Sequence, residues 1–197
     1  MKDKIEELVE LCKQINDSWH NNENRDGWKN LRLVPEVATQ LTAMPLEGET
    51  SAANQIDVLS LMIDCVDELA IPRQILSIRK YQLSLFEHLE PEAELQVTRE
   101  EVEQEIQRLE DYVNLSIPME EWCKKYHKHL LFDPVERTLE YETIIYEVEE
   151  EVATELKDEP RCMGFCFAYW AALRTAFAKR GIEWRSPGQM NPRVHFD

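Results

Sequence analysis

Two pairs of potential metal ligands occur at a spacing of four residues. Cys123 and His127 form one pair, and Cys162 and Cys166 form the other. Residues four apart share one face of an α-helix, so two such helices facing each other would offer zinc its tetrahedral set of thiolate and imidazole ligands. The other interpretation is that the cysteines are core residues, because cysteine packs as a small hydrophobic side chain. We favour core packing and keep a zinc site as the alternative.

Arg174 follows a long uncharged stretch and has mainly apolar neighbours in the sequence. A guanidinium buried in such surroundings needs an anionic or carbonyl partner, because an unpaired buried charge is costly. One interpretation is an ion pair with a glutamate of the acidic helices. The other is an anion-binding site, in which Arg161 or Arg185 assists and the helix start at Ser186 offers free backbone N–H groups to a phosphate or carboxylate.

A row of glutamates occurs at helical spacing ahead of the C-terminal segment. A charged row of this kind is usually a solvated helix face. Its other use would be a docking surface for a basic partner, since complementary charge steers association. The residues of this predicted partner-binding row are Glu136, Glu140, Glu147, Glu151 and Glu155.

Motifs of covalent and phosphoryl-transfer catalysis are absent from the sequence. It contains no glycine-rich phosphate loop, no H-E-x-x-H and no G-x-S-x-G. His127 follows Cys123 within one helical turn, but the sequence identifies no third group that would orient the histidine. The sequence therefore favours a binding protein over an enzyme.

Apolar residues recur at intervals of three and four along most of the chain, the spacing typical of amphipathic helices. We expect helices over about residues 3–18, 35–43, 50–70, 72–89, 98–113, 116–130, 133–157 and 161–181, with one further turn after Ser186. The stretch from Cys162 to Leu173 carries no charge, which predicts a helix buried on every face. The pattern thus predicts an all-α fold, a single domain over residues 1–197 with about eight helices around a buried C-terminal helix.

Capping signals indicate where several of these helices begin and end. Thr98 with Glu101, and Ser186 with Gln189, have the spacing of a capping box. Asp133 followed by Pro134 predicts the start of a long helix that continues to about residue 157. Gly181 has the position of a C′ glycine, which ends a helix in the left-handed conformation.

The charge is strongly acidic and unevenly distributed. The chain has 39 acidic and 22 basic side chains and a net charge of −17, which argues against general binding to nucleic acids or anionic membranes. An acidic body, residues 1–159, carries −21, and a basic C-terminal segment, residues 160–197, carries +4. We favour internal packing of the basic segment against the acidic body. The alternative use of the acidic body is binding to a basic partner.

Five cysteines, an odd number, form no disulfide framework, and the charged amphipathic start is unlike a secretory signal. We therefore expect a cytoplasmic protein without a membrane segment. The function favoured by the sequence is a non-enzymatic, acidic helical protein-binding module, such as an inhibitor, adaptor or immunity-type protein, with a basic partner. The alternatives are an enzyme or sensor that binds a small anion through Arg174 and Arg185, and a zinc-stabilised regulatory protein. The oligomeric state stays open.

Overall fold

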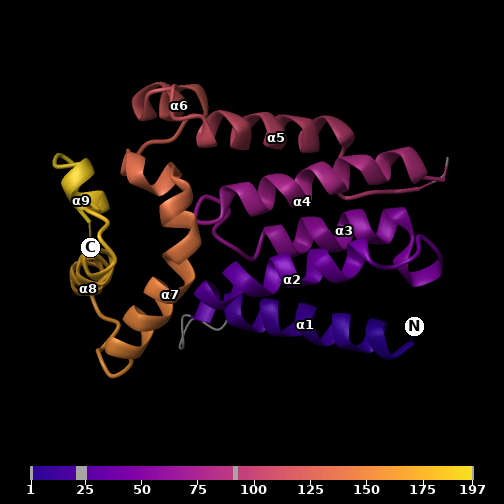
Figure 1. Ribbon diagram of the computed structural model, residues 1–197, viewed down its shortest axis with the longest axis horizontal. Helices are drawn as coiled ribbons and strands as arrows, with labels where there is room; N and C mark the ends of the chain where they lie inside the picture. Colours follow the sequence, from indigo (N-terminus) through magenta and orange to yellow (C-terminus); the bar gives the residue numbers. More distant parts are fainter. Residues whose placement is uncertain (1, 21–25, 91–92, 197) are drawn as a thin grey trace. The chain divides into compact units, whose positions relative to one another are not determined.

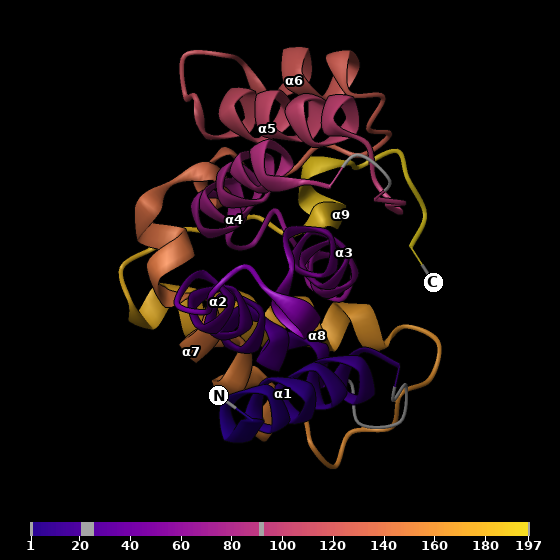
Figure 2. The same cartoon turned by 90° about the vertical axis from the view of Figure 1, so that its right-hand side faces the viewer.

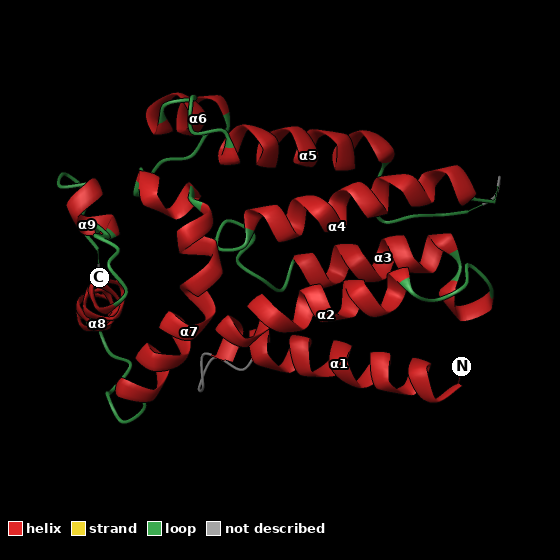
Figure 3. Ribbon diagram, viewed as in Figure 1, coloured by secondary structure: helices red, strands yellow, loops and turns green. Residues whose placement is uncertain are grey.

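A computed structural model describes residues 2–20, 26–90 and 93–196 of the chain. These residues form nine α-helices and four short 3₁₀ helices and no strand, so the prediction of an all-α fold is confirmed (Figures 1 and 3). No helix in the described ranges has the length and apolar character needed to cross a membrane. The chain divides into two compact units, Met1–Glu110 and Asp111–Asp197. The grouping of all residues into one domain stays a prediction.

The first unit is built from α1 (Lys2–His20), α2 (Asn30–Thr42), α3 (Ala52–Ile63), α4 (Pro72–Leu85) and most of α5 (Arg99–Val113), with 3₁₀ turns at Asp26–Lys29, Gly48–Thr50 and Phe86–His88. Helices α1 to α4 lie side by side, and Figure 2 shows the same stack from the side. Their apolar stripes meet in a core whose fully buried members include Ile15, Leu41, Ile56, Leu59 and Ile75. Burial of these stripes is the main force that assembles the unit.

The second unit contains α6 (Met119–Lys125), the 3₁₀ turn Pro134–Arg137, α7 (Leu139–Glu155), α8 (Phe165–Lys179) and α9 (Pro187–Met190). Helices α7 and α8 pack against each other. Tyr141 of α7 stacks on Phe177 of α8 with ring centroids 5.1 Å apart, and Trp184 after α8 lies 5.7 Å from Phe177. These aromatic rings join the first turn of α7 to the last turn of α8.

Three capping predictions are confirmed. Thr98 N–H donates to Glu101 Oε2 at 2.7 Å, and Glu101 N–H donates to Thr98 Oγ1 at 3.2 Å. Ser186 and Gln189 form the second capping box at the start of α9. Gly181 ends α8 with a φ of +79°, a conformation that glycine adopts without strain.

Several predicted boundaries are wrong, and polar side chains explain two of them. Helix α3 ends at Ile63 rather than near residue 70, and Asn30 Nδ2 holds the turn that follows by donating to the carbonyl of Cys65 at 2.6 Å. The long helix expected from Asp133 is interrupted at Thr138. This residue has an extended backbone, and its Oγ1 caps α7 by accepting from Tyr141 N–H. The start predicted at Pro35 is also wrong, because α2 begins at Asn30 and includes that proline.

Helix α8 buries one side rather than every face, which corrects the expectation from its uncharged sequence. Ala172, Leu173, Ala176 and Phe177 are buried, whereas the side chain of Phe167 is 55% exposed. Alanine and other small residues account for much of the remaining surface, and their exposure costs little free energy. The absence of charge in this stretch therefore reflects small residues on the outer side as well as large ones in the core.

Candidate functional site

The structure does not assemble the predicted zinc ligands. In the described part of the chain, no group of three or more His, Cys, Asp or Glu side chains is placed to hold a metal ion. Cys123 lies on α6, but α6 ends at Lys125, and His127 follows in a turn with a φ of +52°. The premise that these two residues share a helix face is therefore wrong.

The second ligand pair fails for the same geometric reason. Gly164 has a φ of +84° and precedes the first helical residue, so α8 begins at Phe165. Cys162 lies before the helix and is exposed, and Cys166 lies on its first turn and is half-buried. A spacing of four residues across a helix start does not place two thiols on one face.

Cys123 is a core thiol, as the favoured interpretation predicted, whereas for the exposed Cys162 that interpretation is wrong. Cys123 is buried on α6, and its Sγ donates to the carbonyl of Leu130 at 3.5 Å. Burial raises the pKa of this thiol above its ordinary value. Because the thiolate is the nucleophile and the metal ligand, these surroundings suppress both kinds of reactivity.

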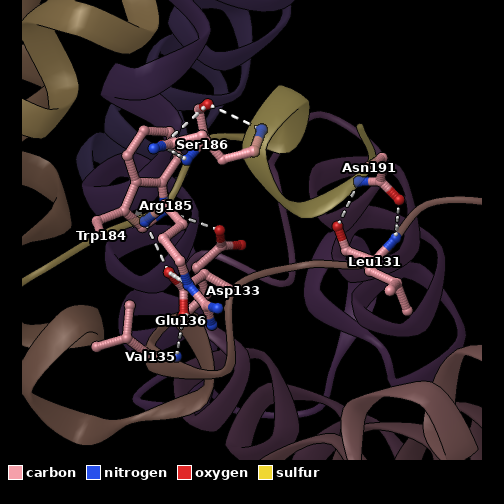
Figure 4. Close-up of polar contacts among 9 residues, drawn as sticks. Leu131, Asp133, Val135, Glu136, Trp184, Arg185, Ser186 and Asn191 are labelled. Carbon is pink, nitrogen blue, oxygen red and sulfur yellow. Dashed lines mark hydrogen bonds and ion pairs between the residues drawn. The ribbon is translucent and has the colours of Figure 1, made fainter. Parts of the chain in front are cut away.

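The predicted anion site at Arg174, Arg185 and Ser186 does not form either. Arg174 is exposed on α8, so solvent hydrates its guanidinium and the expected need for a buried partner is wrong. Arg185 is bound to Asp133, with its backbone N–H at 2.7 Å and its Nε at 3.1 Å from Oδ2 (Figure 4). Ser186 N–H donates to Gln189 Oε1 at 3.0 Å within the capping box. The Arg185 guanidinium and the Ser186 N–H, which would hold the anion, are therefore already hydrogen-bonded within the protein.

The glutamate row is divided between structural and exposed positions. Glu136 Oε1 accepts from Trp184 Nε1 at 2.8 Å, and Glu151 forms ion pairs with Lys179 at 2.6 Å and Arg180 at 2.7 Å. Glu140 and Glu155 are exposed, and Glu147 is half-buried. The row is therefore no continuous docking surface, because two of its members bind the C-terminal segment.

Contacts between the acidic α6–α7 region and the C-terminal segment recur along the second unit. Beside the Asp133–Arg185 and Glu136–Trp184 contacts, Asn191 exchanges two hydrogen bonds of 2.9 Å with the backbone of Leu131 (Figure 4). The ion pairs at Asp133 and Glu151 show that basic residues after 160 do bind acidic residues before it, as the internal-packing interpretation predicted.

Arg137 is the buried arginine that sequence reasoning missed. Its side chain is 2% exposed and donates to four backbone carbonyls, those of Asp111, Tyr112, Asn114 and Ile117, at 2.5–3.1 Å. It therefore organises the turn between α5 and α6. The signal in the sequence was weak, because Arg137 lies in a polar stretch that resembles an ordinary helix start.

Helix α1 carries more exposed carboxylates than any other described helix of the first unit. Asp3, Glu6, Glu7, Glu10 and Asp17 recur at helical spacing, and all five are exposed. Glu10 lies 3.8 Å from Lys13, whereas no ion pair of Asp3, Glu6 or Glu7 occurs within the described residues. We call these five residues the acidic face of α1. Leu8 and Ile15, on the opposite side, are buried in the core of the unit.

We compared the chain with models of known protein families, with curated proteins and with solved structures, and none of them matches it.

Proposed function

We propose that this protein is a non-enzymatic, acidic helical module that binds the basic surface of a partner protein. The observation that carries the proposal is the acidic face of α1, whose five carboxylates are exposed on a helix that is fixed by its opposite side. An exposed row of one sign attracts a surface of the other sign and raises the rate of encounter.

The charge of the whole unit supports the same proposal. Residues 1–110 include 23 acidic and 11 basic side chains, a net charge of −12, whereas residues 111–197 have a net charge of −5. In the second unit, Glu136, Glu151 and Asp133 bind the C-terminal segment. The acidic surface available to a partner therefore belongs mainly to the first unit, and α1 supplies its most regular part.

Val9 and Trp19 add an apolar contribution to the same helix. Their side chains are 47% and 43% exposed, and they lie among the polar residues of α1. Protein interfaces commonly combine apolar or aromatic anchors with a polar rim, and tryptophan is enriched among the residues that dominate binding energy. At 100° per residue, however, Val9 and Trp19 project away from the five carboxylates, so the partner surface that fits the acidic face is basic and does not include this apolar pair.

Affinity capture at two salt concentrations tests this function. The immobilised full chain is incubated with cell extract in about 50 mM and about 500 mM NaCl, because screening between exposed charges is weak at the first and strong at the second. We expect a specifically retained protein with a basic surface at low salt and its loss at high salt, measured by quantitative mass spectrometry. Retention that is equal at both concentrations would count against a charge-driven interface.

A further inference from the structure

A polar cavity of about 370 Å³ lies within the first unit, apart from the acidic face of α1. It is bounded by the end of α3, the turn between α3 and α4, and one residue each from α4 and α5. The residues that line it are Ile63, Asp64, Val66, Glu68, Arg79 and Glu105. Its volume falls within the range of pockets that hold small molecules, about 300–1,000 Å³.

Arg79 is the unusual member of this lining. Its residue surface is 7% exposed, and its Nη1 donates to Gln82 Oε1 at 2.9 Å. Its Nε is buried and has no hydrogen-bond acceptor within the described residues. Burial lowers the pKa of this guanidinium from its ordinary value. A guanidinium has five N–H donors, so the bond to Gln82 leaves most of them without an acceptor. Because this amide is neutral, it provides no direct ion pair for the positive charge.

The carboxylates around the cavity differ in how they are used. Glu68 and Glu105 both bind Arg108, and Glu105 Oε2 lies 2.6 Å from Arg108 Nη2. Asp64 is exposed and forms no ion pair with another described residue. Within the described residues, Arg79 therefore has no carboxylate at ion-pair distance, although Glu105, Glu68 and Asp64 stabilise its charge from farther away, and Asp64 has no direct ion pair.

This combination of charges selects the chemistry of a ligand. A ligand with only a carboxylate would pair with Arg79 but would meet the negative field of Asp64, Glu68 and Glu105. A ligand with only an ammonium group would pair with Asp64 and leave the buried guanidinium as it is. A molecule with both groups satisfies both positions, since arginine binds carboxylates through parallel N–H donors and aspartate accepts from ammonium groups.

We propose that this cavity binds a small zwitterion of the amino-acid class, with its carboxylate on Arg79 and its ammonium group on Asp64. A purely structural ion network accounts for Arg108, which joins Glu68 of the turn to Glu105 of α5. It does not account for Arg79, whose one direct hydrogen-bond partner in the described structure is a neutral amide. The ligand supplies the direct anionic contact that Arg79 does not receive from Glu105, Glu68 or Asp64.

Calorimetric titration of the full chain with the common α-amino acids tests the proposal. We expect at least one of them to bind saturably at concentrations up to about 10 mM. Its amine and carboxylic acid analogues, which each lack one charged group, should have affinities at least about tenfold lower. Absence of saturable binding by every amino acid would overturn the proposal. Equal binding of either single-charge analogue would overturn it as well.

A variant of Asp64 tests the site without disturbing the core. Because Asp64 is exposed, D64N is expected to fold normally and to weaken amino-acid binding about tenfold. The matched control is D17N, which removes the same charge from an exposed position on α1 and is expected to bind as the native protein does. Unchanged affinity in D64N would contradict the assignment. D64N leaves the acidic face of α1 intact, so the outcome is independent of partner binding.

Discussion

At the scale of single residues, buried arginines are the most informative feature of this protein. Arg79, Arg108 and Arg137 are each at most 7% exposed, and each has a different kind of hydrogen-bond acceptor. Arg79 donates to a side-chain amide, Arg108 to two glutamates, and Arg137 to four backbone carbonyls. Burial of a guanidinium is costly to the extent that its donors are left unsatisfied. The donors of Arg137 are the most fully satisfied of the three, so this residue stabilises the fold. Arg79 has donors that remain available to a ligand.

Replacement of Arg137 by methionine is expected to lower the free energy of unfolding by about 3 kcal/mol or more. The methionine fills similar space but leaves four backbone carbonyls without this donor, one of them on the buried residue Tyr112, and such losses are costly. Urea unfolding followed by circular dichroism measures the effect. The control is R174M, at an exposed position, which is expected to change stability by about 0.5 kcal/mol or less. Similar losses in the two variants would contradict the account of Arg137.

At the scale of helices, the sequence predicted most elements and several of their ends, but not the boundaries that depend on distant residues. Amphipathic periodicity and capping boxes depend on residues that are close in sequence, so α1, α5 and α9 were predictable. The end of α3 depends on Asn30, which binds the Cys65 carbonyl from 35 residues away. No local pattern contains that information, because the contact exists only after the helices have packed.

The candidate sites were less predictable for a related reason. The zinc hypothesis required that each pair of ligands occupy one continuous helix. Helix α6 ends before His127, and α8 begins after Cys162. The anion hypothesis required Arg185 to be free, but Asp133, 52 residues earlier, binds it. Long-range pairing thus occupies Arg185, whereas the zinc pairs are divided by helix boundaries that residue spacing alone does not reveal.

The ion pairs between α7 and the end of α8 make a pH-dependent contribution to stability. Lys179 and Arg180 lower the pKa of Glu151 below its ordinary value of 4.5, so this carboxylate stabilises the folded state while it is ionised. Its contribution is present above that ordinary value and is lost as the pH falls through the lower, folded-state value. We expect the melting temperature of the native protein to fall more than that of E151Q between about pH 6 and about pH 3.

The control for this prediction is E155Q, which changes an exposed glutamate of the same helix. E155Q should retain the native pH dependence, because Glu155 forms no ion pair with another described residue. The measurement is made at low ionic strength, where salt does not screen the Glu151 pairs. Identical pH profiles for the native protein and E151Q would show that the Glu151 pairs contribute nothing measurable.

At the scale of the whole molecule, the net charge of −17 opposes folding through repulsion between like charges. Salt screens this repulsion, so the melting temperature is expected to rise by about 3 °C between about 10 mM and about 150 mM NaCl. Scanning calorimetry measures the change. The triple variant E6Q/E7Q/E10Q, which has three fewer negative charges, should show a smaller rise. A melting temperature that falls with added salt would mean that attractive ion pairs outweigh the repulsion.

The same triple variant tests most directly whether the acidic face of α1 binds the partner. Its affinity for the protein captured at low salt is compared with that of E120Q/E121Q/E140Q, which removes three exposed carboxylates from the second unit. We expect E6Q/E7Q/E10Q to bind at least about tenfold more weakly than the native chain, and the control to bind within about twofold of it. Equal losses in the two variants, or no loss in E6Q/E7Q/E10Q, would contradict the proposed function.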